Sequence, residues 1–408
     1  MAKDRLISPR EAWKTIFRHV HPLGVERRLL GEACGACLAE DVLADRDMPP
    51  ADRAAMDGYA VMAADLAHVP RELRLIGEVG AGSPARPRVR QGTCVRVATG
   101  ANVPPGADTV VMLEQTVPRG EQVCFLVPVE KGANIFRRGE DARKGKVLLR
   151  HGTLLEPRHI GICAATGKTA VKVRRRPCVA ILCTGDELRQ VADKVWPHEV
   201  RNSTGPTVEA ALREAGYDVT ASKTIPDDVG KLVRALRRCA SRSDAIIVTG
   251  GVSVGKSDYV RAAVERVEAT VRFHGVAMKP GKPLLYATLP GNRHVFGLPG
   301  NPVSALTGFY LFALSALHRL AGLPLTACRP VVHLPLAAAV FSKGDRLRWQ
   351  LVRVQWTKDR PSLMPLRSQS VADLVAGGLA DGVAVVPASK RQLPAGTVVA
   401  FHPWRSLP

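Results

Sequence analysis

Two stretches, CVAILCT at residues 178–184 and DAIIVTGG at residues 244–251, are short and almost entirely apolar. Runs of this kind predict strands that are buried on both faces of a parallel sheet. Between them, TVEAALREAG (207–216) and VGKLVRALRRCA (229–240) space their apolar residues as helices do, on either side of a third strand-like run, YDVTASKTI (217–225). This alternation predicts βαβ units around a largely parallel sheet.

The rest of the chain has different patterns. Residues 1–30 show helical spacing, and residues 141–175 mix helix and strand patterns. Residues 37–140 hold short apolar runs broken by glycine, proline and aspartate, which predicts a β-rich domain of short strands. Residues 327–408 again predict short strands with little helix. We therefore expect a multidomain protein with one α/β part and two β-rich parts.

The composition fits a folded protein that attracts anions. The 408 residues (43.9 kDa) are 46% hydrophobic and 23% charged, an ordinary globular mixture that excludes disorder. Lysine and arginine number 58 against 37 acidic residues, so the formal net charge is +21. This charge favours nucleic acid, acidic lipid, or phosphorylated and oxyanionic small molecules as partners.

Targeting and redox signals favour a cytoplasmic protein. The N-terminus carries charges throughout and lacks the apolar segment of a secretory signal. The nine scattered cysteines fit a reduced compartment. Residues 295–317 hold no charged side chain, but Pro299, Gly300 and Pro302 interrupt them. This interruption predicts a buried core helix rather than a membrane span, which needs about 20 apolar residues.

Residues 250–257 (GGVSVGKS) match the phosphate-binding P-loop pattern and lie between a predicted strand and a predicted helix. Two observations argue against a P-loop nucleotide hydrolase. The turn follows the third strand of the α/β part rather than the first, and no later apolar strand ends in an aspartate that could hold Mg²⁺. A glycine turn beside a helix start still suits phosphate. Asp258, at that helix start, either caps the helix or holds a metal.

Three more segments place polar groups at turns of the α/β part. Residues 184–188 (TGDEL) put two acids at the carboxyl end of the first strand, where open α/β sheets bind ligands. Residues 278–283 (MKPGKP) hold two lysines in a proline-stiffened turn. Residues 298–304 (LPGNPVS) place Asn301 and Pro302 at a helix start, which is typical of an oxyanion site beside such lysines. Taken singly, each segment has a plain structural explanation as a solvated turn or helix start.

Taken together, the segments resemble the molybdopterin molybdenumtransferases, the family of bacterial MoeA and the gephyrin E domain. The resemblance runs in order from residue 1 to residue 405. The segments that carry it are MPP (48–50), AMDGYAV (55–61), GEVGAG (77–82), ATGA (98–101), VPPGADTV (103–110), RGED (138–141), TGDEL (184–188), RNS (201–203), GGVSVG (250–255), KPGKP (279–283) and LPGNPVS (298–304).

The resemblance implies an architecture and an activity. It implies homodimers, with the active site between the α/β domain of one subunit and the inserted domain of the other. Such enzymes insert molybdate into adenylylated molybdopterin with Mg²⁺, release AMP and form the molybdenum cofactor. Molybdopterin adenylyltransferase and apo-molybdoenzymes are implied partners, whereas nucleic acid and membranes are not. The implied parts are a linker domain (1–36 and 141–176), an inserted β-rich domain (37–140), an α/β molybdopterin-binding domain with a parallel-rich sheet (177–326) and a small β-barrel-like domain (327–408).

The resemblance also implies roles for residues at matching positions. Pyrophosphate would lie on the glycine turn, and molybdate near the two lysines and Ser304. The implied Mg²⁺ ligands are Asp186, Glu187 and Asp258. The implied catalytic residues are Asp57, Thr99, Asp141, Glu187 and Asp258, of which the first three would face the site from the partner subunit. The implied ligand-binding residues are Thr184, Gly185, Gly250, Gly251, Val252, Ser253, Gly255, Lys279, Lys282, Pro302 and Ser304.

Two positions depart from the family pattern, and two alternative functions stay open. Phe136 and Gly275 stand where many relatives carry a basic residue, and we expect weaker binding of anionic substrate from each loss. The alternatives are a P-loop-like nucleotide hydrolase and a basic nucleic-acid-binding protein. The second predicts basic stripes interleaved with aromatic residues. Aromatic residues are only 5% of the chain, and the densest basic segments, 174–176 and 234–242, contain none.

Overall fold

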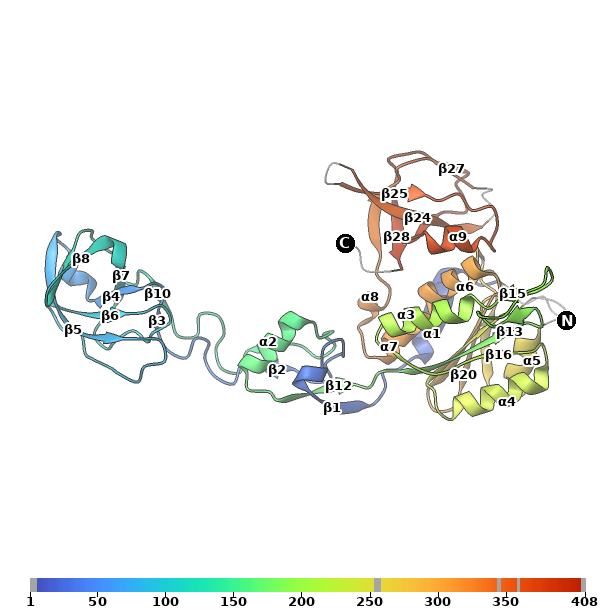
Figure 1. The fold of residues 1–408 in the computed structure, drawn as a ribbon, viewed down its shortest axis with the longest axis horizontal. Helices are drawn as coiled ribbons and strands as arrows, with labels where there is room; N and C mark the ends of the chain where they lie inside the picture. Colours follow the sequence, from blue (N-terminus) through green and yellow to red (C-terminus); the bar gives the residue numbers. More distant parts are fainter. Residues whose placement is uncertain (1–5, 253–257, 343–345, 358–359, 405–408) are drawn as a thin grey trace. The chain divides into compact units, whose positions relative to one another are not determined.

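The computed structural model describes residues 6–252, 258–342, 346–357 and 360–404. Contacts divide the chain into two compact units (Figure 1). The larger unit comprises Met1–Ala39, Gly152–Glu156 and Val171–Pro408, and the smaller unit comprises Glu40–His151 and Pro157–Ala170.

A six-stranded sheet forms the centre of the larger unit, in the order β16-β13-β17-β21-β20-β18. The first four strands pair in parallel, and β20 and β18 complete the sheet in antiparallel pairs. The expected parallel-rich α/β sheet is therefore confirmed, with an antiparallel edge. The strands are β13 (Cys178–Thr184), β16 (Asp218–Ile225), β17 (Ala245–Thr249), β18 (Thr270–His274), β20 (Leu285–Leu289) and β21 (Arg293–Leu298).

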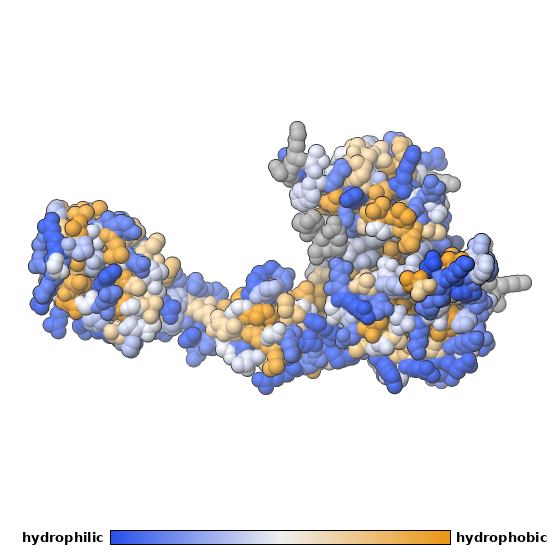
Figure 2. Space-filling model, viewed as in Figure 1, coloured by the Kyte–Doolittle hydropathy of each residue, from blue (hydrophilic) through white to orange (hydrophobic). Residues whose placement is uncertain are grey.

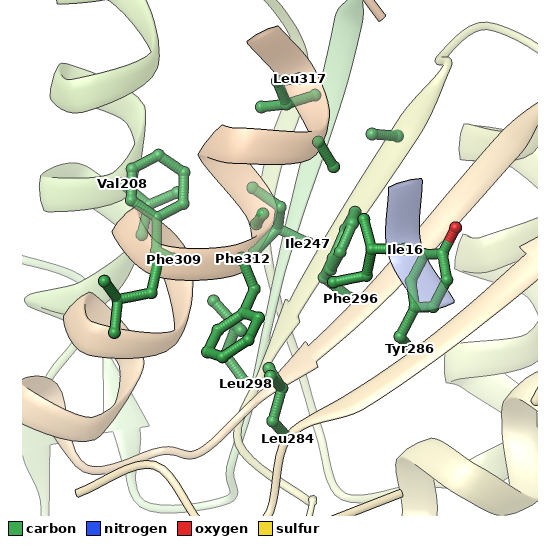
Figure 3. Close-up of a cluster of buried hydrophobic side chains, with 14 of the residues drawn as sticks. Ile16, Val208, Ile247, Leu284, Tyr286, Phe296, Leu298, Phe309, Phe312 and Leu317 are labelled. Carbon is green, nitrogen blue, oxygen red and sulfur yellow. The ribbon is translucent and has the colours of Figure 1, made fainter. Parts of the chain in front are cut away.

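Helices cover both faces of this sheet, as the sequence pattern predicts (Figure 1). Neighbouring strand residues alternate between two cores: Ile181 joins the cluster that contains Ile16 and Val208, whereas Leu182 joins the cluster that contains Leu236. Figure 3 shows the first of these clusters. On that face lie α1 (Pro9–His19), α3 (Thr204–Glu214), α6 (Pro302–Gly308) and α7 (Leu314–Leu320); on the other lie α4 (Val229–Ala240) and α5 (Tyr259–Glu265).

The long apolar helix Pro302–Leu320 belongs to this core. By length and composition it could cross a membrane, but 78% of its most apolar window is buried inside the protein. A π-helical turn, η4 (Phe309–Ala313), joins α6 to α7. The Leu311 carbonyl in this turn accepts a hydrogen bond from the Trp13 indole nitrogen at 2.7 Å. The prediction of a core helix is confirmed within the described residues.

A second sheet in the larger unit forms the C-terminal β domain, in the order β19-β24-β26-β28-β22, and β25 also pairs with β24. Its first strand comes from the α/β part, because β19 (Met278–Lys279) pairs in parallel with β24 and places Lys279 opposite Arg348. The other elements are α8 (Leu325–Cys328), β22 (Val332–Pro335), β23 (Val340–Phe341), β24 (Leu347–Thr357), β25 (Arg360–Pro365), α9 (Leu374–Gly378), β26 (Gly382–Val386), β27 (Gln392–Leu393) and β28 (Val398–Pro403).

Trp13 connects three parts of the larger unit. Its ring stacks on Phe312 at a centroid distance of 5.2 Å and meets Trp349 edge-on at 6.1 Å. The Arg329 guanidinium lies over the Trp13 ring, 3.7 Å from its centroid. Aromatic pairs of this kind add stability beyond their buried area. One side chain of α1 therefore fixes both the core helix and the C-terminal sheet.

The smaller unit is β-rich, as expected. Its six-stranded sheet has the order β7-β4-β6-β5-β9-β8 and apolar residues on both faces. Alternate residues of β4 separate the faces, with Ala60 in one cluster and Tyr59 and Val61 in the other. The elements here are β2 (Val42–Leu43), β3 (Arg53–Ala54), β4 (Gly58–Val61), β5 (Arg71–Val79), β6 (Thr93–Val97), β7 (Thr109–Met112), β8 (Thr116–Arg119), β9 (Gln122–Phe125), β10 (Ile135–Phe136), β11 (Val147–Leu149) and α2 (Pro157–Ala165). The pair of β1 (Val25–Leu29) and β12 (Ala170–Arg174) belongs, but for Ala170, to the larger unit.

Three histidines, two of them buried and one half-buried, make the fold sensitive to acid. Burial lowers the pKa of His294, His318 and His402 from 6.5 to about 4 in each case. Between pH 6.5 and about 4, the unfolded chain binds protons that the folded chain does not accept. We expect the free energy of unfolding to fall as the pH drops through this window, by up to about 1.4 kcal/mol per histidine per pH unit.

Urea unfolding followed from pH 7.5 to pH 4.5 measures this effect. His318→Gln should make the decline shallower. His333→Gln, at an exposed position, should leave the profile unchanged. Identical profiles for the wild type and His318→Gln would contradict the assignment.

Candidate functional site

Three turns meet at one edge of the α/β sheet because three parallel strands end in register. Cys183 of β13 pairs with Thr249 of β17, which pairs with Leu298 of β21. The Gly250 N–H donates to the Leu298 carbonyl at 3.1 Å and ties two of these turns together. The carboxyl edge of such a sheet is the usual position of a ligand site.

Gly250 and Gly251 need to be glycine. Their φ angles are +86° and +61°, in the left-handed region. A Cβ on Gly250 would lie 2.1 Å from the Thr184 carbonyl oxygen, and one on Gly251 would lie 2.9 Å from Thr184 Oγ1. The β17 turn can therefore approach the β13 turn only without side chains. Ser253 and Gly255, also predicted to bind ligand, lie outside the described residues.

A cavity of about 640 Å³ opens at this edge. Thr184, Glu187, Gly250 and Pro302, four of the predicted residues, line it. Val252 is 4% exposed, its side chain belongs to the hydrophobic core, and it does not line this cavity. The other lining residues are Leu188, Val200, Arg201, Asn202, Ser203, Thr204, Thr249, Gly300, Asn301, Ala372 and Leu374.

Acidic groups gather beside the β13 turn. Asp186 Oδ1 accepts a hydrogen bond from the Asp227 N–H at 3.1 Å. Burial raises the pKa of Asp227, and the neighbouring charges of Asp186 and Glu187 raise it further. Asp227 Oδ1 and Thr184 Oγ1 are both buried, and neither forms a hydrogen bond of good geometry within the described residues. These carboxylates repel one another and leave oxygen atoms available for a cation.

Asp258 does cap a helix, and it has a second contact. Its Oδ1 accepts the Arg261 N–H at 3.0 Å, the N-cap interaction of α5. Its Oδ2 lies 3.4 Å from Nδ1 of the buried His274. Burial raises the pKa of Asp258, although the Arg261 N–H and His274 act in the opposite direction. Capping, one of the two roles expected from its position, is thus the contact that the structure shows for this residue.

The lysine turn contributes one residue to a cationic cavity, whose second cation, Arg348, the sequence did not suggest. Lys279 lines a cavity of about 260 Å³ together with Arg348, Ser368 and Ser370. The pairing of β19 with β24 brings the two cations together, and burial lowers the pKa of Arg348. The predicted neighbours Lys282 and Ser304 do not line this cavity. Ser304 is 4% exposed within α6.

Asn301 occupies the N-cap position of α6 and Pro302 its first turn, as predicted, but the Asn301 side chain forms no capping hydrogen bond. It lines the cavity instead. Gly275, where relatives carry a cation, has a φ of +103°, and a Cβ there would lie 2.7 Å from Leu6 Cδ2. A basic residue at this position would need a different backbone. The backbone conformation at Gly275 therefore accounts for the absence of a basic side chain there.

In the smaller unit, Asp57 and Thr99 form a compact pair. The Thr99 N–H and Oγ1 both donate to Asp57 Oδ1, at 2.6 and 2.9 Å. These two bonds, the backbone one first, lower the pKa of the exposed Asp57 carboxyl. Asp141 is exposed, and its N–H donates to the Met48 carbonyl at 3.0 Å. Phe136 is 48% exposed at the end of β10.

Comparison with known proteins covers the whole chain. Family models match over residues 7–167 (MoeA N-terminal region, domain I and II), 180–319 (probable molybdopterin binding domain) and 333–404 (MoeA C-terminal region, domain IV). A molybdopterin molybdenumtransferase of Staphylococcus epidermidis is 32% identical over 400 residues, 96% of this chain and 94% of the relative. One from Staphylococcus aureus is 33% identical over 401 residues, 97% and 95% of the two chains.

A solved structure agrees. The molybdopterin biosynthesis MoeA protein of Pyrococcus horikoshii OT3 superposes with a TM-score of 0.84 at 28% identity, over 98% of this chain and all of that one. The chain belongs to the MoeA family. The resemblance and the multidomain fold class expected from the sequence are thus confirmed. Neither alternative function finds support in these matches.

The MoeA-family chain has residues at this site that its sequence motifs did not single out. Asp227 belongs to none of the motifs quoted from the sequence, and its neighbour Asp228 caps α4 by accepting the Lys231 N–H at 2.6 Å. Arg348 carries no local motif. Only the folded structure makes them candidate site residues, because it places Asp227 beside Asp186 and Arg348 beside Lys279.

The acid cluster suits a Mg²⁺ ion that phosphate oxygens also bind. Within the described residues, no three His, Cys, Asp or Glu side chains stand close enough to hold an ion by themselves. Mg²⁺ often binds through one or two carboxylates together with substrate phosphates and waters. The buried Asp227 Oδ1, which forms no hydrogen bond of good geometry within the described residues, fits such a partial site. Asp227 therefore joins Asp186 and Glu187 as a candidate ligand, and Asp258, also predicted to bind Mg²⁺, caps α5.

Replacing Asp227 with asparagine tests this cluster. The raised pKa means that an ionised Asp227 costs stability at neutral pH, so Asp227→Asn should raise the Tm of the free protein. Mg²⁺ with pyrophosphate, at a hundredfold excess over its Kd, should stabilise the wild type by about 2.7 kcal/mol. We expect this increment to disappear in Asp227→Asn.

Asp228→Asn is the matched control for this experiment. It alters the N-cap of α4 one residue away and should lower the Tm slightly, while it keeps the response to Mg²⁺ with pyrophosphate. Differential scanning calorimetry measures both quantities. An unchanged ligand response in Asp227→Asn would remove this residue from the site.

Proposed function

We propose that this chain is a molybdenum insertase of molybdenum cofactor biosynthesis, which inserts molybdate into adenylylated molybdopterin and releases AMP. One observation carries the proposal: a cavity at the carboxyl edge of the sheet is lined by Gly250 of the glycine turn and Glu187 of the acid cluster, and it lies next to a cationic pocket. Relatives that match nearly the whole chain are named molybdopterin molybdenumtransferase. The geometry of the site is compatible with the transfer reaction that this name denotes.

The two cavities are neighbours. Pro302 lines the larger cavity and Val303 the cationic one, and Ala372 and Val371 are divided in the same way. A ligand in the larger cavity therefore has an adjoining place for a small oxyanion. This is the arrangement needed to bring molybdate and the pterin together, because positioning supplies much of the rate of such an exchange.

The pyrophosphate of the substrate would bind at the turn of Gly250 and Gly251. A glycine turn next to a helix start presents backbone N–H groups to phosphate oxygens. Asp186, Glu187 and Asp227 would hold Mg²⁺ on the other side of the pyrophosphate. The bound ion would neutralise phosphate charge and favour departure of AMP. Asn202 and Asn301, which line the cavity, would orient the ligand by amide hydrogen bonds.

Lys279 and Arg348 would hold molybdate. Two cations in a cavity of about 260 Å³ match a small tetrahedral dianion, and Ser368 and Ser370 add hydroxyl donors. The Arg348 Nη1 group donates to the Phe341 carbonyl at 2.8 Å, which fixes the guanidinium in place. The oxyanion site thus depends on pairing between β19 and β24 rather than on the lysine turn alone.

Arg348→Ala tests the oxyanion pocket. It should raise the molybdate concentration needed for half-maximal AMP release by about 10- to 100-fold, as expected for loss of charge-assisted hydrogen bonds. Binding of adenylylated molybdopterin without molybdate should be unchanged, measured by isothermal titration calorimetry. Arg353→Ala, at an exposed position further along β24, is the control and should behave as wild type.

AMP release that needs no oxyanion, or that is absent with every oxyanion while the ligand still binds, would overturn the insertase proposal itself. Equal molybdate dependence in wild type and Arg348→Ala would overturn only the placement of molybdate. Molybdate and tungstate are both tested, because both are tetrahedral dianions.

We also propose that the enzyme acts as a homodimer in which Asp57, Thr99 and Asp141 serve the reaction in the other subunit. Asp57→Ala and Asp258→Ala should each abolish AMP release. When the two variants are unfolded, mixed and refolded, half of the dimers would be mixed and would carry one intact site. We expect about a quarter of wild-type activity to return.

Mixing Asp57→Ala with itself is the control and should recover nothing. Sedimentation velocity establishes the oligomeric state in each mixture. No recovery in mixed dimers would show that Asp57 and Asp258 act within one chain. The cytoplasmic location and direct contact with an adenylyltransferase or apo-molybdoenzymes stay predictions.

A further inference from the structure

A third cavity, of about 320 Å³, lies on the larger unit between the edge strand β16 and helix α4. Strand β16 is the outermost strand of the six-stranded sheet and pairs only with β13. The floor of the cavity is apolar and consists of Leu182, Ala221, Ala235 and Cys239. None of its lining residues lines the cavity at the carboxyl edge. We call this feature the β16 groove.

Five cations surround the β16 groove: Lys223, Lys231, Arg234, Arg238 and Arg242. All five are exposed, and within the described residues none of them forms a salt bridge. Hydrophilic side chains cover the part of the surface where α4 lies (Figure 2). The same basic segment, 234–242, stands out in the sequence, and the proposed reaction makes no use of it.

The cations converge on the groove rather than spread around the helix. Lys231, Arg234 and Arg238 follow one another at intervals of three and four residues, which places them on one face of α4. Lys223 reaches the same place from β16, because both Lys223 and Arg238 act to lower the pKa of the Cys239 thiol, against the larger effect of burial. Arg237, on the same helix, points elsewhere and donates to the Arg266 carbonyl at 3.3 Å.

We propose that the β16 groove binds an acidic, extended segment of a partner protein, which adds as a further strand at the edge of β16. An edge strand offers its backbone groups to such a segment. Alternate side chains of an added strand point to one face about 6.6 Å apart, close to the rise of about 6 Å between Arg234 and Arg238 on α4. Acidic residues at alternate positions would therefore meet successive cations.

A protein segment fits this groove better than a nucleic acid does. The lining residues include no aromatic side chain on which a base could stack. A phosphate backbone forms no specific contacts with an apolar floor or with the free backbone groups of an edge strand. An extended peptide can pack its apolar side chains on the floor and pair its backbone with the edge strand. The groove does not depend on the insertase reaction, so it can be tested even if that proposal fails.

Fluorescence anisotropy with a labelled peptide, Glu-Val-Glu-Val-Glu-Val-Glu, tests the proposal on the full-length protein. We expect saturable binding that Arg238→Glu weakens by about tenfold or more, since a charge reversal faces the acidic side chains. Arg237→Glu changes the charge of the chain equally, on the neighbouring helix position outside the groove. It should shift the Kd by less than about twofold.

Two further probes separate strand addition from simple charge attraction. The same peptide with N-methyl groups on alternate backbone nitrogens cannot pair with β16 and should lose the binding. A thymidine oligonucleotide of equal charge should bind more weakly than the peptide. Equal effects of Arg237→Glu and Arg238→Glu, tighter binding of the oligonucleotide, or a change of oligomeric state in Arg238→Glu without peptide binding would each overturn the proposal.

Discussion

The in-register parallel pairing of β13, β17 and β21 is the constraint on which the site depends. It brings the turns at Thr184, Gly250 and Gly300 to one edge, so close that a Cβ on Gly250 would meet the Thr184 carbonyl oxygen at 2.1 Å. A shift by one residue would also exchange the two cores, because Ile181 and Leu182 face opposite layers. The buried sheet thus fixes where the turns meet, and the glycines let them meet.

Local sequence predicts this sheet and its glycine turns, since apolar runs and glycines act over a few residues. It predicts less of the polar site. Asp227 resembles the adjacent helix cap Asp228, and only folding places it beside Asp186. Arg348 meets Lys279 through a strand pairing across 69 residues of chain, for which no local pattern exists. Packing likewise determines that Ser304 is buried, because its neighbours in α6 are buried too. No local pattern in the sequence predicts this burial.

The site is built at the expense of stability. Asp227 is half-buried among like charges, and Asp258 is half-buried, with its helix cap, His274 and the charge of Arg261 to offset the cost. The larger unit compensates through contacts far from the edge, such as the stacking of Trp13 on Phe312 and Trp349. A ligand that brings a cation and phosphate to the acids would relieve their repulsion, so binding and folding stability are linked.

The net charge of +21 conceals two opposite arrangements. Near the β13 turn, acidic side chains lie close together in a protein whose net positive charge repels cations. We therefore expect a free Mg²⁺ ion to bind there less tightly than an ion that is already bound to phosphate. The excess of positive charge then acts on the whole ligand, which is anionic even with its metal. If Lys279 and Arg348 hold molybdate, as we propose, their cavity of about 260 Å³ would admit only a small anion. The general field would then attract the substrates, and the few groups that line the cavities would distinguish them.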